Sequence, residues 1–124
     1  MAAPDLDDLA EAIYPIVLAA ARSRRGIITY GALCQRLPNP WVDLAPHDPR
    51  LGQALGLIGR RLRAVDLPWL TAVVVGQERQ EPGKGFFDDA FPKLPAAERT
   101  RVWIDELARV KAAAFPEALR DICP

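Results

Sequence analysis

The sequence predicts an α+β fold that is predominantly helical, with about four helices and a small sheet of two or three strands. A β-branched run, Leu70–Val75, is typical of a buried strand. Apolar residues recur at helical spacing in three long segments, 4–24, 49–64 and 95–115. We expect one domain over 1–124, made of an N-terminal helix (1–25), a core (26–87) and a C-terminal helix (95–116).

The composition favours a partner that binds one surface over a uniformly basic nucleic-acid binder. Among 124 residues, 16 basic side chains balance 16 acidic ones. The balance conceals a gradient, because residues 1–20 carry four acids and no base, whereas residues 21–66 carry eight arginines and three aspartates. Such a basic centre suits a localised anionic partner. Ordinary solvated faces in an arginine-rich chain remain the alternative.

The cysteine and histidine content argues against cofactor chemistry. Cys34 and Cys123 lie far apart, and His47 is the single histidine. This set lacks the spacing of a zinc site and offers no thiol with a nearby base. We therefore expect no cofactor, no metal and a reduced, cytoplasmic chain. No apolar run approaches the roughly 20 residues of a membrane span, so we expect no membrane partner.

The first helix carries a proline within its apolar pattern. Pro4 suits a first helical position, and the acids that follow suit the positive end of the helix dipole. Pro15 removes a backbone donor and predicts a kink or a split near Tyr14. Gly26 is a candidate C-cap.

The next two helices have clear starting signals. Thr29 is an N-cap for a short helix over 30–36, and Asp48-Pro49 combines an N-cap with proline at the first helical position. Between them, a proline-rich loop is expected to be anchored by Trp41. The second of these helices contains Gly52, Gly56 and Gly59, each costing roughly 1 kcal/mol relative to alanine. That cost indicates close approach of another helix or of a nucleic-acid backbone.

The segment after the strand predicts a hairpin or wing-like loop over 76–85. A second strand is expected at Gln80–Glu81 or at Phe86–Phe87. Pro95 is expected to start the last helix.

Four motifs occur in a recognisable order: Ile28-Thr29-Tyr30-Gly31, Leu51-Gly52-Gln53-Ala54-Leu55, Leu67-Pro68-Trp69-Leu70 and Gly83-Lys84-Gly85-Phe86. In this order the central stretch resembles the C-terminal domain of O6-alkylguanine-DNA alkyltransferases and alkyltransferase-like proteins. The resemblance covers roughly half of the chain and implies a winged-helix-like core with a DNA surface. Where that family has Pro-Cys-His-Arg, this chain has Ala72-Val73-Val74-Val75. The resemblance therefore implies no alkyl transfer, and we expect a non-enzymatic protein.

The predicted DNA-binding residues centre on the arginine-bearing helix. In a helix-turn-helix the N-terminal part of the second helix enters the major groove, and arginine forks bind phosphates or guanine edges. The predicted set is Tyr30, Arg50, Gln53, Arg60, Arg61, Arg63 and Lys84. Accessory phosphate contacts are expected from Arg22, Arg24 and Arg25.

Two other functions stay open besides duplex DNA binding. A protein-interaction module, such as an immunity or adaptor protein, would dock through the central helix and the Phe86 loop. A metal-dependent hydrolase or nuclease would combine Lys84 with Asp88 or Asp89. The glycines around Lys84 suit either a phosphate cradle or an exposed turn. Phe86, Phe87 and Phe91 suit core positions, and one of them suits a stacking platform instead.

Overall fold

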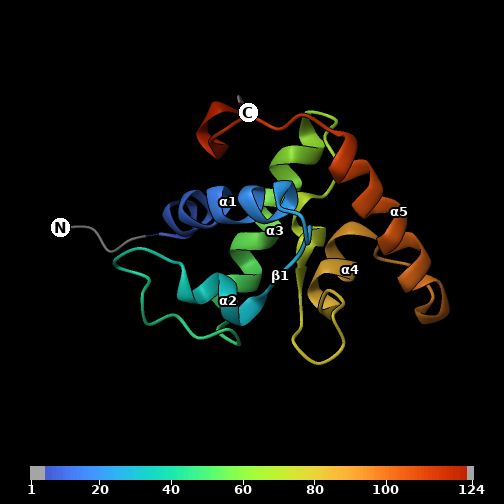
Figure 1. Cartoon of the computed structure of the whole chain (residues 1–124), viewed down its shortest axis with the longest axis horizontal. Helices are drawn as coiled ribbons and strands as arrows, with labels where there is room; N and C mark the ends of the chain where they lie inside the picture. Colours follow the sequence, from blue (N-terminus) through green and yellow to red (C-terminus); the bar gives the residue numbers. More distant parts are fainter. Residues whose placement is uncertain (1–4, 123–124) are drawn as a thin grey trace.

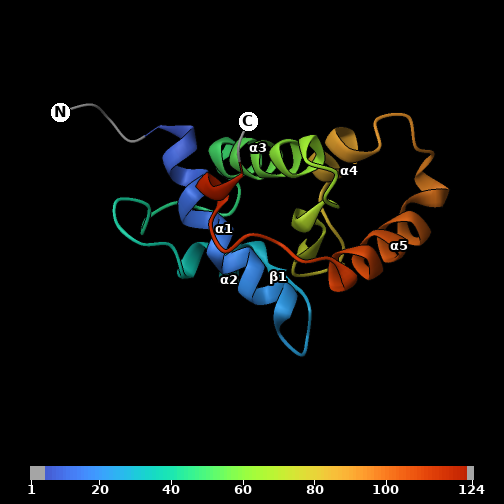
Figure 2. The ribbon, with the colours of Figure 1, turned by 90° about the horizontal axis from the view of Figure 1, so that it is seen from above.

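The computed structural model describes residues 5–122 and confirms a mostly helical α+β protein. Its helices are α1 (Leu6–Arg22), α2 (Tyr30–Gln35), α3 (Pro49–Ala64), α4 (Lys84–Ala90) and α5 (Arg99–Ala112). Its strands are β1 (Ile28–Thr29) and β2 (Val74–Val75), and three short 3-10 turns cover Leu70–Val73, Ala96–Glu98 and Leu119–Asp121. Helices α1 and α3 pack together at the centre, while α4 and α5 lie to one side (Figures 1 and 2).

Helix α1 runs unbroken through Pro15, so the predicted split near Tyr14 was wrong. Pro15 lies on the exposed side of α1, where water can replace the hydrogen bond that the ring removes, and the opposite face is buried. The N-cap is Asp5, whose carboxylate accepts the Asp8 amide at 2.9 Å; Pro4 lies outside the described residues. The C-cap is Ser23 rather than Gly26, whose φ of 75° instead turns the chain toward β1.

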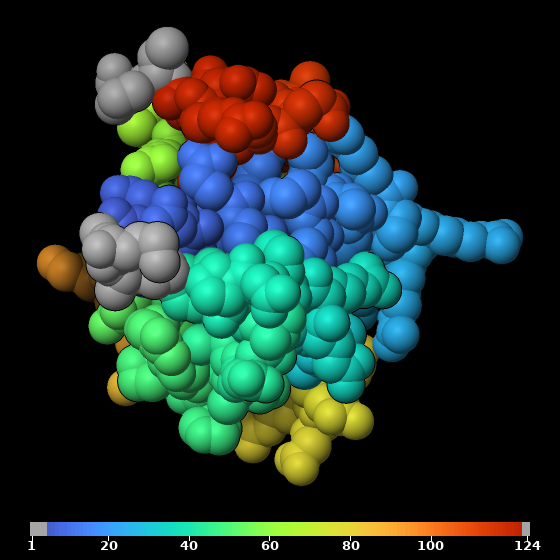
Figure 3. All heavy atoms as spheres, turned by 90° about the vertical axis from the view of Figure 1, so that its left-hand side faces the viewer, coloured from blue at the N-terminus to red at the C-terminus, as the bar shows by residue number. Residues whose placement is uncertain are grey.

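The starting signals of α2 and α3 are confirmed. The Thr29 hydroxyl accepts the Ala32 amide at 3.1 Å, and the Asp48 carboxylate accepts the Arg50 amide at 2.9 Å. Trp41 is 7% exposed and anchors the loop between the two helices, as expected. Figure 3 shows this loop and α2 lying beside α1, which crosses the middle of that face.

The sheet is smaller than expected, because only Val74–Val75 of the predicted strand Leu70–Val75 is extended. Strand β2 pairs in parallel with β1, Ile28 opposite Val74 and Thr29 opposite Val75. The preceding residues, Leu70–Val73, form a 3-10 turn instead of a strand. Side chains from α5 explain the difference, because Trp103 donates to the Ala72 carbonyl at 2.8 Å and Glu106 accepts the Trp69 amide at 2.8 Å. These bonds satisfy main-chain groups that an extended strand would otherwise have paired.

The predicted second strand is absent from the described residues. Gln80–Glu81 lie in a turn closed by a 2.8 Å bond from the Gly76 amide to the Glu81 carbonyl. Phe86–Phe87 belong to α4, where Phe87 is buried against Trp103, Ala72 and Val75. Burying this aromatic pair in a second small core favours a helix that packs on α3 and not a hairpin.

The last helix is shorter than expected. Pro95 precedes a 3-10 turn, so α5 begins at Arg99, and it ends at Ala112. Beyond it, the chain crosses back over α1, where the Tyr14 hydroxyl donates to the Pro116 carbonyl at 2.7 Å and Leu119 is fully buried.

Candidate nucleic-acid interface

A groove between α3 and α4 forms a concave surface beside the predicted site. Its volume is about 630 Å³. It brings together three predicted residues: Tyr30 from the start of α2, and Gln53 and Arg60 from α3. The other side chains that give it chemical character are Trp69, Thr71, Phe86, Asp88 and Asp89. We call this surface the α3–α4 groove.

Tyr30 holds one end of the groove. Its hydroxyl accepts the Gly83 amide at 3.0 Å, which ties the start of α2 to the start of α4. A Cβ on Gly83 would lie 3.2 Å from that hydroxyl, so glycine allows the two segments to approach. Burial raises the pKa of Tyr30 above its ordinary value, although the Gly83 hydrogen bond opposes the shift. Tyr30 is therefore a neutral phenol whose proton can still be donated into the groove.

Arg60 and Asp89 face each other across the groove. The guanidinium and carboxylate lie 3.8 Å apart, and both side chains are partly exposed. Gly56 lies beneath them, since a Cβ there would be 2.7 Å from the Asp89 carboxylate. The space above Gly56 is thus filled by this chain's own α4, not left open for a nucleic-acid backbone. Gly59 is covered by Trp69 in the same way, whereas nothing lies within 4 Å of a Cβ on Gly52.

Most other predicted arginines are already held by groups of this chain. The pairs are Arg50 with Asp48 (2.9 Å), Arg61 with Asp7 (2.8 Å) and Arg22 with Glu117 (2.9 Å), and Arg25 donates to Gln80 (3.3 Å). Exposed ion pairs of this kind contribute about 0–1 kcal/mol, so a phosphate can replace the carboxylate at little cost. The free protein nevertheless presents less positive charge than its arginine count suggests.

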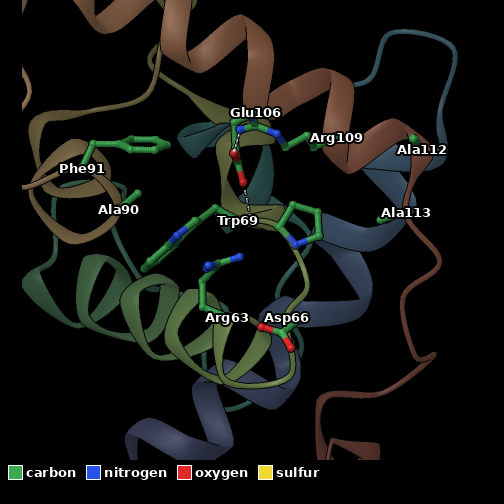
Figure 4. Close-up of a pocket in the computed structure, with 10 residues that line it drawn as sticks. Arg63, Asp66, Trp69, Ala90, Phe91, Glu106, Arg109, Ala112 and Ala113 are labelled. Carbon is green, nitrogen blue, oxygen red and sulfur yellow. Dashed lines mark hydrogen bonds and ion pairs between the residues drawn. The ribbon is translucent and has the colours of Figure 1, made fainter.

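Arg63 lies in a different hollow, of about 580 Å³, between the end of α3 and α5. Figure 4 shows Arg63 and Asp66 on one side of this hollow and Glu106 with Arg109 on the other. The buried Glu106 carboxylate accepts the Trp69 amide and pairs with Arg109 at 2.9 Å. Trp69 lines both this hollow and the α3–α4 groove, so its indole separates Arg63 from Arg60.

Lys84 and the accessory arginines are also set apart from the groove. Lys84 lines a third cavity with Arg99 and the two acids of the preceding turn. Asp88 and Asp89 line the groove instead, so the structure does not join Lys84 to either carboxylate in one cavity. Arg24 is exposed beyond the end of α1.

Several groove residues were missed as site residues from sequence. From the sequence, Trp69 was noted only as part of a family motif and Thr71 only as part of a predicted strand. Asp89 was considered only as a carboxylate of the hydrolase alternative. Their chain positions gave no signal of convergence, because the groove forms only when α4 packs on α3.

The described residues provide little for metal or thiol chemistry. Within residues 5–122, no three His, Cys, Asp or Glu side chains cluster in a way that could hold a metal ion. Cys34 is buried, and burial raises the pKa of its thiol, which disfavours the reactive thiolate. Cys123 lies outside the described part of the chain. Across 5–122, the helices are too short or too polar to traverse a bilayer.

Comparison with protein-family models, with curated proteins and with solved structures produced no match for this chain.

Proposed function

We propose that this chain is a non-enzymatic DNA-binding module that engages duplex DNA through the start of α3 and the α3–α4 groove. The observation that carries the proposal is the convergence of Tyr30, Gln53 and Arg60 on one groove. Its volume lies in the range of small-ligand sites, roughly 300–1,000 Å³. The proposal includes a winged-helix-like arrangement, with α2 and α3 as the helix pair and residues 76–90 in the place of the wing.

The groove chemistry suits base edges better than phosphates. Arg60 and Gln53 offer the donors and acceptors that read guanine and adenine, while the Asp89 carboxylate can accept from an exocyclic amine. Trp69 and Phe86 add aromatic surface, their rings 6.3 Å apart in an edge-on arrangement. Because Asp88 and Asp89 repel phosphates, we assign backbone contacts to the exposed Arg50 at the start of α3. A groove with these features favours a distorted or modified duplex in which base edges are accessible.

Fluorescence anisotropy with labelled DNA tests the proposal. The probes are an intact duplex, the same duplex with one central mismatch, and a single strand, each between 50 and 200 mM salt. We expect salt-sensitive binding that is strongest for the mismatched duplex. Arg60→Ala should weaken it roughly three- to tenfold, consistent with loss of one exposed charged contact. Arg63→Ala should change it less, because Arg63 lies beyond Trp69.

The control is Arg120→Ala, which removes one exposed charge outside the groove. Equal weakening in this control would show that only net charge matters. Absence of binding to all three probes at the lowest salt would overturn the proposal.

A protein partner is the second candidate, and the internal ion pairs favour it. Arg22, Arg50, Arg60 and Arg61 are each matched by a carboxylate, which gives the surface a mixed charge. Such a surface suits a partner that is itself of mixed charge. Failure of every DNA probe, together with capture of one defined protein that Gln53→Arg prevents from binding, would support this candidate.

A further inference from the structure

We propose that a second surface of this chain is a phosphate-binding site: the notch between the end of α1 and α2. This cavity has a volume of about 260 Å³, enough for a phosphate group but below the usual size of drug-sized ligand sites. Its polar lining consists of Ser23, Arg25, Thr29, Arg36 and Gln80. Two arginines, Arg25 and Arg36, line the notch, and no aspartate or glutamate is among its lining residues.

The turn at residues 77–81 separates its polar groups between two sides. Glu81 accepts a hydrogen bond from Thr100 of α5 at 3.0 Å, and Glu78 lines the same cavity as Glu81, away from the notch. Gln80 instead faces the notch from a left-handed backbone conformation, with φ of 56°. Its amide donates to the Gln77 carbonyl at 2.8 Å, which fixes the side chain. The turn thus keeps its acids out of the notch and places a neutral amide in it.

The neutral Gln80 side chain positions the Arg25 guanidinium without neutralising its charge. The Gln80 carbonyl oxygen accepts from the Arg25 guanidinium at 3.3 Å. Arg36, at the C-cap of α2, also lines the notch. Within residues 5–122, neither Arg25 nor Arg36 forms an ion pair, in contrast to Arg22 next to this region. Two like charges on one small cavity repel each other, and a bound anion relieves that repulsion.

Of the two hydroxyl groups that line the notch, that of Ser23 already donates to the Ala20 carbonyl at 2.6 Å, so only that of Thr29 can donate to a ligand. The Thr29 oxygen already accepts the Ala32 amide, so its remaining role is to donate its proton outward. A phosphate group offers several acceptor oxygens that match two guanidinium forks and one hydroxyl. The phosphate can belong to a nucleic-acid backbone or to a small phosphorylated molecule. The site does not depend on DNA binding by the α3–α4 groove.

Titration with inorganic phosphate, followed by the amide NMR spectrum, tests the site. Sodium chloride at equal ionic strength is the reference. We expect phosphate-specific shifts confined to the amides of Arg25, Gly26, Arg36 and Gln80, with Kd on the order of 1 mM because both arginines are exposed. Arg25→Gln with Arg36→Gln should abolish them. Equal shifts with chloride, or none with phosphate, would overturn the proposal.

Matched variants separate local binding from net charge and from folding. Lys111→Gln with Arg120→Gln removes the same charge from exposed positions outside the notch, and the phosphate shifts should persist. Loss of the shifts in this control would also overturn the proposal. If the double variant at the notch unfolds, Gln80→Gly provides the test, because glycine tolerates the left-handed backbone. That variant should bind phosphate roughly threefold more weakly, since Arg25 loses its only fixed hydrogen bond in the described chain.

Duplex DNA identifies the source of the phosphate. A phosphodiester source predicts that DNA shifts the same amides and binds roughly three- to tenfold more weakly to the notch variant. Unchanged DNA affinity with persistent inorganic phosphate shifts assigns the site to small phosphorylated molecules. Both results retain the notch as a phosphate site, and failure of DNA to bind the groove would leave the inorganic phosphate result unaffected.

Discussion

Helix α3 contains two glycines for which alanine should have opposite effects on stability. A Cβ at Gly59 would lie 1.9 Å from Cζ3 and 2.1 Å from Cε3 of Trp69, whereas a Cβ at Gly52 meets nothing within 4 Å. Both substitutions gain about 1 kcal/mol or somewhat less from helix propensity. The difference between the two variants therefore isolates the contact between α3 and Trp69.

The size of the penalty follows from how firmly Trp69 is held. Carbon atoms pack at about 3.5–4.0 Å, so the indole would have to move by roughly 1.6 Å or more. Trp69 is 7% exposed, its amide is bound by Glu106, and its ring contacts Phe86. Overpacking of a held core side chain costs about 1–3 kcal/mol, and this displacement exceeds one methylene, so we take the upper end. After the propensity gain, Gly59→Ala should lose about 2 kcal/mol of unfolding free energy, while Gly52→Ala should gain about 0.5–1 kcal/mol.

Urea unfolding followed by far-UV circular dichroism measures both variants in one series. We expect the Gly59→Ala transition to shift to lower urea and the Gly52→Ala transition to higher urea. Combining Gly59→Ala with Trp69→Leu should remove most of the Gly59→Ala penalty, because the clashing ring is gone. Equal stability of the two single alanine variants would refute the packing of Trp69 on α3.

Three further predictions concern Glu106 and Tyr14, whose side chains bind main-chain groups of distant segments. Glu106→Ala should lose about 1–3 kcal/mol by leaving the Trp69 amide unpaired, and Glu106→Gln should lose less because it keeps an acceptor; urea unfolding compares them. Tyr14→Phe should lose about 0.5–1.5 kcal/mol with its bond to Pro116, visible as faster amide exchange in residues 117–122. Burial raises the pKa of Tyr14 from 10.0 to about 12, so stability should be constant below pH 10 and fall as pH rises toward 12. Tyr14→Phe should reduce this loss of stability between pH 10 and pH 12. An unchanged pH profile would contradict the attribution of the loss to Tyr14.

The starts of α2 and α3 could be predicted because their signals are local. Thr29 and Asp48 each bind an amide two or three residues further along the chain, which the sequence order alone reveals. The mostly helical fold class could also be predicted, because the spacing of apolar residues indicates which face of each helix is buried. The split predicted at Pro15 failed for the complementary reason: whether proline interrupts a helix depends on whether the affected side of the helix faces water.

The remaining features depend on contacts between distant segments. Leu70–Val73 has a strand-like composition but forms a 3-10 turn, because two α5 side chains bind its main-chain groups. Of the predicted site, Tyr30, Gln53 and Arg60 do meet in one groove, while Arg63 is separated from them by Trp69. No local pattern indicates that Arg61 of α3 meets Asp7 of α1 on the surface, so the neutralisation of the basic centre could not be foreseen.

The attachment of α5 has a consequence for how this sequence can diverge. Trp103 and Glu106 lie three residues apart on one face of α5, and both bind main-chain groups of the segment 69–72. Every residue type supplies the carbonyl that Trp103 uses, and every type except proline supplies the amide that Glu106 uses. As far as these two bonds are concerned, the segment 69–72 can therefore change its side chains, while position 103 must keep a side-chain donor and position 106 a side-chain acceptor. A tryptophan followed three residues later by glutamate or glutamine in the last helix is thus the spacing by which distant descendants of this chain should be recognised.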